Sequence, residues 1–128
     1  LDTNICSAHF RRPGGLAHSF FQHSGRLAVS AIVLAELYVW AHSRSDPSPL
    51  LTCLRELLRD VRVLPFDTDC AERFGRLRAG LKRSGQSVQD MDLMIASVAL
   101  VHDLTLVTHN VADFQFIPDL RIEDWLAP

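Results

Sequence analysis

The chain has 128 residues and a formal net charge of −2, with 48% hydrophobic and 22% charged residues. This composition is typical of a folded globular protein, and the length predicts a single domain over residues 1–128 rather than a multidomain, repeat or disordered protein. No apolar run approaches the ~20 residues of a membrane-spanning helix and no secretory leader is recognisable, so we expect a cytoplasmic protein.

The cysteines and the first residue carry two further expectations. Cys6, Cys53 and Cys70 are odd in number and widely spaced, which fits neither a disulfide framework nor a zinc knuckle. We therefore expect reduced, structural thiols. The sequence starts at Leu1 without a methionine, directly at the end of an expected strand, and we expect that the N-terminus has been trimmed by a few residues.

Short apolar runs bounded by turn residues predict buried strands of a parallel sheet. In chain order they cover residues 27–29, 61–64, 104–107 and 120–122. Helical patterns separate these runs, so we expect right-handed crossovers and an α/β fold with a central, mostly parallel sheet between two helical layers. In such folds ligands bind beyond the carboxyl ends of the strands.

The predicted helices begin at recognisable start signals. Ser30 is expected to cap a helix over residues 31–42, and Asp46 followed by Pro47 is expected to open a helix to about residue 60. Asp69 with Glu72 resembles a capping box, which predicts a helix to about residue 83. A last helix is predicted over residues 88–102, from its apolar spacing.

Four acidic residues are expected at one edge of this sheet. Asp2 stands where a strand delivers the chain to a helix, and Asp113 follows the strand 104–107 by a turn. Glu36 lies in the second turn of the helix after strand 27–29, and Asp92 lies near the start of the last predicted helix. For each acid taken alone, a helix cap or a solvated surface group is an equally ordinary explanation.

Four carboxylates at one place repel one another unless a cation lies among them. Oxygen ligands without histidine or thiolate neighbours favour Mg²⁺ or Mn²⁺, and such ions serve the hydrolysis of phosphodiester bonds. If the four acids are ligands, the rest of the chain has 13 basic and 11 acidic residues. The net charge of that remainder is +2, which suits a nucleic-acid partner.

The motifs "LDTN", "VSAIVLAELYVWA", "DLMIASVALVHDLTLVTHNVADF" and "LRIEDW" together resemble those of a PIN-domain ribonuclease of the VapC toxin type, over essentially the whole chain. The resemblance is closest to the branch described as cutting initiator tRNA. It implies a three-layer α/β/α PIN fold, a toxin of a toxin-antitoxin system, and an endoribonuclease that depends on Mg²⁺ or Mn²⁺. It also implies a cognate VapB antitoxin, a homodimer, and products with a 5′-phosphate and a 3′-hydroxyl.

Carried over by position, the resemblance implies that the four acids are the metal ligands: Asp2, Glu36, Asp92 and Asp113. It places Asn4, Thr108 and Asn110 behind them as polar groups that orient ligands or water. Asp90 departs from the pattern of relatives, and we expect either a helix cap or an extra ligand there, with the cap favoured. His109 departs as well, and facing solvent is favoured over contacting RNA.

Basic residues are candidates for RNA phosphate contacts, with a solvated helix face as the equal alternative. Those candidates are Arg11, Arg12, Arg73, Arg76, Lys82 and Arg83, with Arg78 on an adjacent stripe of the same helix. Aromatic residues that could stack on bases are few. We assign them instead to core or dimer contacts: Phe20, Phe21, Tyr38, Trp40 and Phe74.

Two other functions fit parts of the sequence. A non-catalytic PIN-like module that binds RNA or protein would share the fold but not require all four acids. A phosphatase that forms a covalent phosphoaspartate would explain an aspartate at a strand end. The latter is disfavoured because no second acid stands two residues after Asp2.

Overall fold

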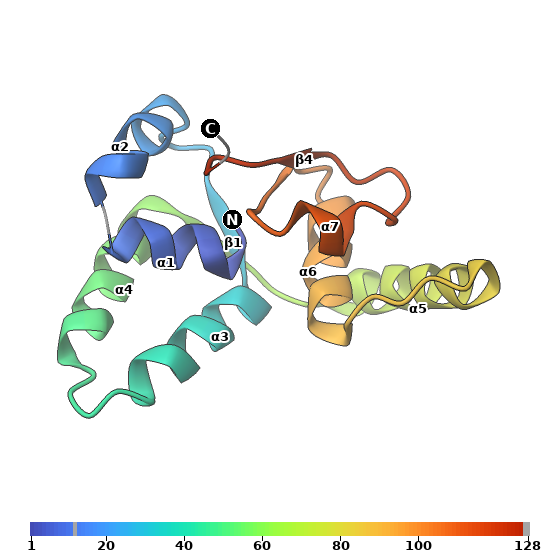
Figure 1. Cartoon of the computed structure of the whole chain (residues 1–128), viewed down its shortest axis with the longest axis horizontal. Coiled ribbons are helices and arrows are strands. Elements are labelled where there is room, and N and C mark those ends of the chain that lie inside the picture. The colour runs from blue at the N-terminus through green and yellow to red at the C-terminus, as the bar shows by residue number, and fades with distance from the viewer. Residues whose placement is uncertain (12, 127–128) are drawn as a thin grey trace.

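The computed structural model describes residues 1–11 and 13–126. Seven helices and four short strands alternate along this part of the chain (Figure 1). In order they are α1 (Thr3–Arg11), α2 (Pro13–Gln22), β1 (Ala28–Ser30), α3 (Ala31–His42), α4 (Ser48–Asp60), β2 (Arg62–Leu64), α5 (Thr68–Ser84), α6 (Asp90–Val101), β3 (Leu106–Val107), α7 (Val111–Phe114) and β4 (Ile122–Glu123).

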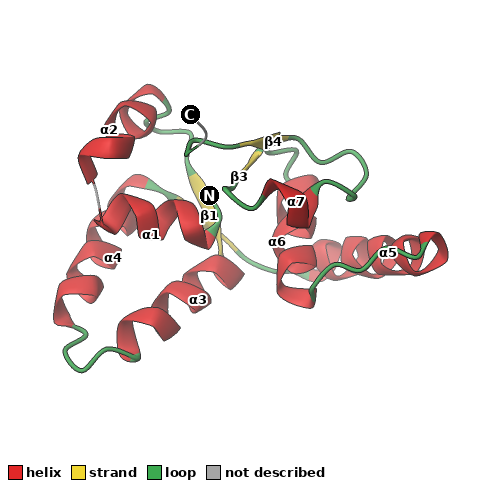
Figure 2. Cartoon of the chain, in the orientation of Figure 1, coloured by secondary structure: helices red, strands yellow, loops and turns green. Residues whose placement is uncertain are grey.

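All strand pairs among the described residues are parallel, as the alternation of strands and helices predicts. β1 pairs with β2, and β3 pairs with β4, so the strands form two narrow sheets at the centre of the molecule (Figure 2). The first residues of the chain lie between these sheets. The amino group of Leu1 donates to Ala28 O on β1 at 2.8 Å, and Asp2 N donates to Val107 O on β3 at 2.8 Å.

Three of the four predicted strands are longer than the observed ones, and strand 27–29 is observed one residue later, as Ala28–Ser30. Strand 104–107 is reduced to Leu106–Val107, and strand 120–122 is observed as Ile122–Glu123. The predicted α/β/α class of a PIN domain nevertheless holds, because helices surround parallel strands on both sides (Figure 1). α3 and α6 both contribute to the buried apolar core, for example through Leu37 and Leu93, which are both 0% exposed.

Two of the predicted helix starts are wrong by a residue or two. Asp67, not Asp69, caps α5, because its carboxylate accepts from Cys70 N at 3.1 Å, and that bond holds the pKa of Asp67 below its usual range. Gln89 is the N-cap of α6, so Asp90 is the first helical residue rather than the cap.

One start signal acts as predicted, and another is displaced by one residue. Ser30 Oγ accepts from Val33 N at 3.1 Å and opens α3. Asp46 still accepts from Ser48 N at 3.2 Å, although Pro47 takes the cap position and α4 starts one residue later. Each bond satisfies an amide that the first helical turn leaves without a partner.

The three cysteines are free thiols, as predicted, with Cys6 and Cys70 buried. Burial raises the pKa of Cys6 to about 12. Phe20 packs partly buried against the core, but Phe21 is 83% exposed, so its assignment to the core is wrong. Within the described residues, no helix combines the length and the apolar character needed to cross a bilayer.

Candidate metal site

Asp2 is the most rigidly held of the four predicted acids. It is 5% exposed, and the sheet fixes its backbone through the bond from Asp2 N to Val107 O. Its two carboxylate oxygens have separate donors: Thr3 N reaches Oδ1 at 2.7 Å, and Thr108 Oγ1 reaches Oδ2 at 2.8 Å. A carboxylate out of water requires such donors, and here they also fix its direction.

Glu36 is linked to the same region by Thr3. Thr3 Oγ1 donates to Glu36 Oε1 at 2.8 Å, across 33 positions of sequence. Glu36 is partly exposed, whereas Val33 and Leu37 on the same helix are completely buried. The apolar face of α3 therefore packs inward, and the single carboxylate of the helix lies beside the start of α1.

The remaining two acids come from the C-terminal half of the chain. Asp92 lies in the first turn of α6, and Asp113 lies in the short helix α7 after β3. Burial, the largest cause, and the charges of Asp2, Asp113 and Glu36 together raise the pKa of Asp92 to about 6. The other three predicted acids are thus near enough to act on Asp92, although they come from separate elements of the fold.

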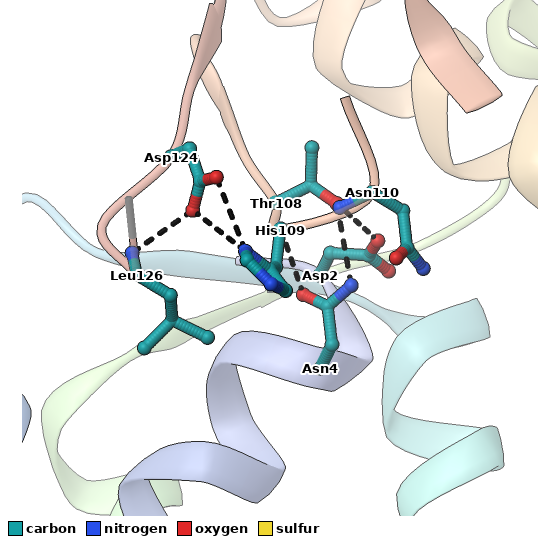
Figure 3. A network of polar contacts seen from close by, with 7 residues as sticks. All are labelled: Asp2, Asn4, Thr108, His109, Asn110, Asp124 and Leu126. Carbon is teal, nitrogen blue, oxygen red and sulfur yellow. Dashed lines mark hydrogen bonds and ion pairs between the residues drawn. The ribbon is translucent and has the colours of Figure 1, made fainter. Parts of the chain in front are cut away.

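A polar network stands behind Asp2 (Figure 3). Thr108, which is 0% exposed, donates to Asp2 and accepts at Oγ1 from Asn110 N at 3.0 Å and from Asn4 Nδ2 at 3.4 Å. Asn4 Oδ1 in turn accepts from His109 N at 3.2 Å. Three predicted orienting residues are thereby brought together: the side chains of Asn4 and Thr108 take part, while Asn110 contributes its backbone amide.

The donor set is that of a hard divalent cation. Carboxylate oxygens without a histidine or thiolate among them suit Mg²⁺ or Mn²⁺, and a cation would relieve the repulsion that raises the pKa of Asp92. Among the described residues, no group of three or more acidic, histidine or cysteine side chains lies close enough to hold an ion as it stands. Asp92 is partly exposed and Asp113 is exposed, so these two side chains are able to turn toward a cation beside Asp2 and Glu36.

Comparison with known proteins identifies the family of the chain. Residues 1–117 match the family described as PIN domain. A "tRNA(fMet)-specific endonuclease VapC" of Salmonella typhimurium is 36% identical over 126 residues, covering 98% of this chain and 96% of that protein. "Ribonuclease VapC2" of Haemophilus influenzae is 32% identical over 127 residues, with the same coverage.

This chain is a PIN-domain protein of the VapC family.

Solved structures of the family have the same fold. The crystal structure of DNA-bound VapBC from Salmonella typhimurium superimposes with a TM-score of 0.92 at 36% identity, covering 98% of this chain and 96% of that one. VapBC2 from Rickettsia felis, bound to a DNA fragment from its promoter, gives 0.91 at 31% identity with the same coverage. The predicted resemblance to VapC is therefore confirmed over nearly the full chain.

The predicted basic residues of this PIN domain are dispersed. Arg76 pairs with Glu72 at 2.8 Å on the exposed face of α5, and Arg11 lies over the Trp40 ring at 5.4 Å. The others named for RNA on α5, Arg73, Lys82 and Arg83, are partly or fully exposed. Arg12 lies outside the described residues.

Asp90 has a different partner from the other acids of the VapC-type site. Its Oδ1 lies 2.6 Å from Arg78 Nη2, and the Arg78 guanidinium also lies over the Phe74 ring at 5.7 Å. Asp90 is not among the charges that act on Asp92. The pairing with Arg78 accounts for Asp90 without a place among the metal ligands.

Another hollow of the domain does not involve the four acids. It is a cavity of about 240 Å³ between the two sheets, lined by residues of β1, β3 and α6 together with Leu1. Its walls are mainly apolar, for example Val29, Ile95 and Leu106, and none of the predicted ligands lines it. The four predicted ligands therefore lie outside this cavity.

Sequence reasoning missed two residues of the site. Thr3 links Asp2 and Glu36, and Asp124 binds the ring of His109. Both stand inside motifs that carry the VapC resemblance, "LDTN" and "LRIEDW". A hydroxyl next to a buried acid was an available signal for Thr3, whereas the pairing of Asp124 with His109 depends on the parallel register of β3 and β4.

Proposed function

We propose that this chain is a toxin endoribonuclease that needs Mg²⁺ or Mn²⁺ and hydrolyses RNA phosphodiester bonds. The observation that carries the proposal is the convergence of acids from separate elements: Thr3 links Asp2 and Glu36, and burial together with the charges of Asp2, Asp113 and Glu36 raises the pKa of Asp92. Such an arrangement is unfavourable for stability in the absence of a cation, and it is therefore characteristic of a functional site. The names of the relatives, ribonuclease and endonuclease, support the same class of reaction.

In this proposal the four acids hold the cation, and the polar network sets their geometry. A divalent cation bound there lowers the pKa of water and stabilises negative charge on the phosphate oxygens. Asp2 is kept in place by its bonds from Thr3 N and Thr108 Oγ1, so the buried carboxylate does not need to reorganise when RNA arrives. Glu36 is oriented by Thr3 in the same way.

The reaction adds one water across one P–O bond. Water attacks the phosphorus, the bond to the 3′ oxygen breaks, and the products carry a 5′-phosphate and a 3′-hydroxyl. The water loses one proton and the leaving 3′ oxygen gains one, so the step is balanced. Burial and the neighbouring charges raise the pKa of Asp92 to about 6 in the metal-free protein, so this carboxyl holds a proton more readily than an ordinary aspartate does.

We further propose initiator tRNA as the substrate and a VapB-type antitoxin as the partner. The first follows from the relative named for tRNA(fMet), and the second from the VapBC complexes that share this fold. A homodimer in which two acidic sites face a common RNA is proposed on the family resemblance alone.

The direct test is cleavage by the purified chain. Transcribed initiator tRNA is incubated with Mg²⁺, with Mn²⁺ and with excess EDTA, and the ends of the products are mapped. We expect cleavage in the anticodon stem-loop with either ion, none in EDTA, and none with Asp2→Asn. Undiminished cleavage in EDTA would refute the metal dependence, and metal binding without cleavage of any RNA would favour a non-catalytic module.

A further inference from the structure

His109 lies at the rim of the carboxylate site, in the turn that follows β3. Its neighbour Thr108 donates directly to Asp2, and its own backbone amide donates to Asn4 Oδ1 at 3.2 Å. Asn4 also donates to Thr108. The backbone of His109 is therefore built into the same network that fixes the buried carboxylate (Figure 3).

The imidazole ring of His109 is fixed as well. Its Nδ1 lies 3.1 Å from Asp124 Oδ2 and 3.3 Å from Asp124 Oδ1. Asp124 is itself held, because its side chain is only 17% exposed and its Oδ1 accepts from Leu126 N at 2.9 Å. The bond from Thr108 N to Glu123 O keeps the two segments side by side.

The opposite edge of the ring is available to a ligand. The side chain of His109 is 54% exposed, and none of the hydrogen bonds found among the described residues uses its Nε2. A ring held by a carboxylate at Nδ1 presents Nε2 in one direction, so little conformational freedom is lost when Nε2 binds a partner.

The surroundings indicate what that partner is. Four acids repel a polyanionic substrate, so a cationic group at their rim is required in addition to the metal. The helix α5, which carries Arg73, Arg76, Arg78, Lys82 and Arg83, extends away from α1 and β1 (Figure 1). Within the described part of the chain, His109 is the basic residue that hydrogen bonds tie to the network around Asp2.

We propose that His109, oriented by Asp124, donates a hydrogen bond from Nε2 to an RNA phosphate adjacent to the one that is cleaved. The proposal rests on the ribonuclease function proposed above. When both ring nitrogens carry a proton, Nδ1 donates to Asp124 on one side and Nε2 donates to the phosphate on the other. His109 is then a substrate-contacting residue, and Asp124 is a positioning residue that acts through it.

The test is RNA binding as a function of salt. A fluorescently labelled single-stranded oligoribonucleotide is titrated with protein in EDTA, where it is not cleaved, and its anisotropy is followed at several KCl concentrations. We expect His109→Ala to weaken binding about three- to tenfold and to lower the slope of log K against log salt by about 0.7, the value for one phosphate contact on a single strand. His109→Lys, which keeps a positive charge, is expected to restore most of the slope.

Asp124→Asn separates positioning from contact. The asparagine retains an acceptor for Nδ1 but lacks the charge, so we expect weaker binding with a smaller change of slope than His109→Ala gives. His102→Ala, an exposed histidine at the opposite end of α6 from Asp92, is the matched control and is expected to bind like the parent chain.

Steady-state cleavage gives a second readout. With Mg²⁺ present, loss of a phosphate contact outside the reacting group is expected to raise KM in His109→Ala while kcat stays within about twofold. A fall in kcat with unchanged KM, or weaker binding with an unchanged salt slope, would overturn the proposal in favour of a structural or hydroxyl contact. A parent chain that never cleaves RNA would refute the ribonuclease function, whereas a cleaving parent with a fully active His109→Ala refutes only the His109 contact.

Discussion

The burial of Asp92, together with the charges of Asp2, Asp113 and Glu36 around it, predicts that Asp92→Asn stabilises the metal-free protein at neutral pH. A carboxyl with a pKa of about 6 in the folded state and an ordinary value of 3.8 is neutral in both states at low pH. As pH rises, the unfolded chain loses its proton first, so the free energy of unfolding falls between about pH 4 and pH 6 and stays lower above that range. The amide that replaces this carboxyl in the variant does not titrate, so the fall is absent there.

The expected size of this effect is about 1 kcal/mol. A difference of two pKa units corresponds to roughly 3 kcal/mol for a group shielded from solvent. Because Asp92 is partly exposed, water screens the repulsion, and we reduce the figure to about one-third. Asp92→Asn is therefore expected to be about as stable as the parent near pH 4 and more stable at pH 7.5 in EDTA.

Urea denaturation followed by circular dichroism, at pH 4.5, 6 and 7.5 in EDTA, measures the difference. A variant that is equally or less stable than the parent at pH 7.5 would refute the argument from repulsion. Added Mg²⁺ gives an independent check. At ten times its Kd the ion stabilises the parent by about 1.4 kcal/mol, and the variant, with one ligand fewer, is expected to gain less at the same concentration.

Three further substitutions or reagents test the site and the core. Glu36→Gln is expected to keep the circular dichroism spectrum and unfolding midpoint of the parent while losing at least 100-fold in cleavage rate, which a product-release assay with Mg²⁺ would reveal. Thr108→Val removes the hydroxyl that donates to Asp2. We expect the free energy of unfolding in urea to fall by about 1–3 kcal/mol and the Mn²⁺ affinity, measured by calorimetry, to fall about ten- to 100-fold. Thr108→Ser keeps the hydroxyl and is expected to retain both the stability and the affinity. Iodoacetamide is expected to leave Cys6 unmodified in the native protein, because it is buried with a pKa of about 12, while the partly exposed Cys53 reacts; mass spectrometry of the modified chain distinguishes them.

The class of fold and the four acids were predictable from sequence because each depends on local patterns. Apolar runs and helix signals set the order of elements, and an acid after a strand or early in a helix is visible in the printed sequence. The comparison with VapC proteins confirms the family, and the pKa of Asp92 shows that the acids act on one another. Their roles as ligands stay predictions.

What sequence could not provide were the contacts that depend on three-dimensional register. Asp67 and Asp69 both lie close in sequence to the start of α5. Asp67 is the cap because its carboxylate is the one that accepts from Cys70 N. The fate of Asp90 depends on the packing of α5 against α6, which brings Arg78 within reach. His109 was expected to face solvent, and half of its side chain does, but its other edge meets Asp124 only because β3 and β4 run in parallel.

The segment Leu1–Asp2 joins the two narrow sheets, because Leu1 N donates to Ala28 O on β1 and Asp2 N donates to Val107 O on β3. The same segment carries the most deeply buried of the four acids. A substitution that loosens the contact between the sheets is therefore expected to shift Asp2 as well, so that a loss of stability at the centre of the fold and a loss of cation affinity occur together.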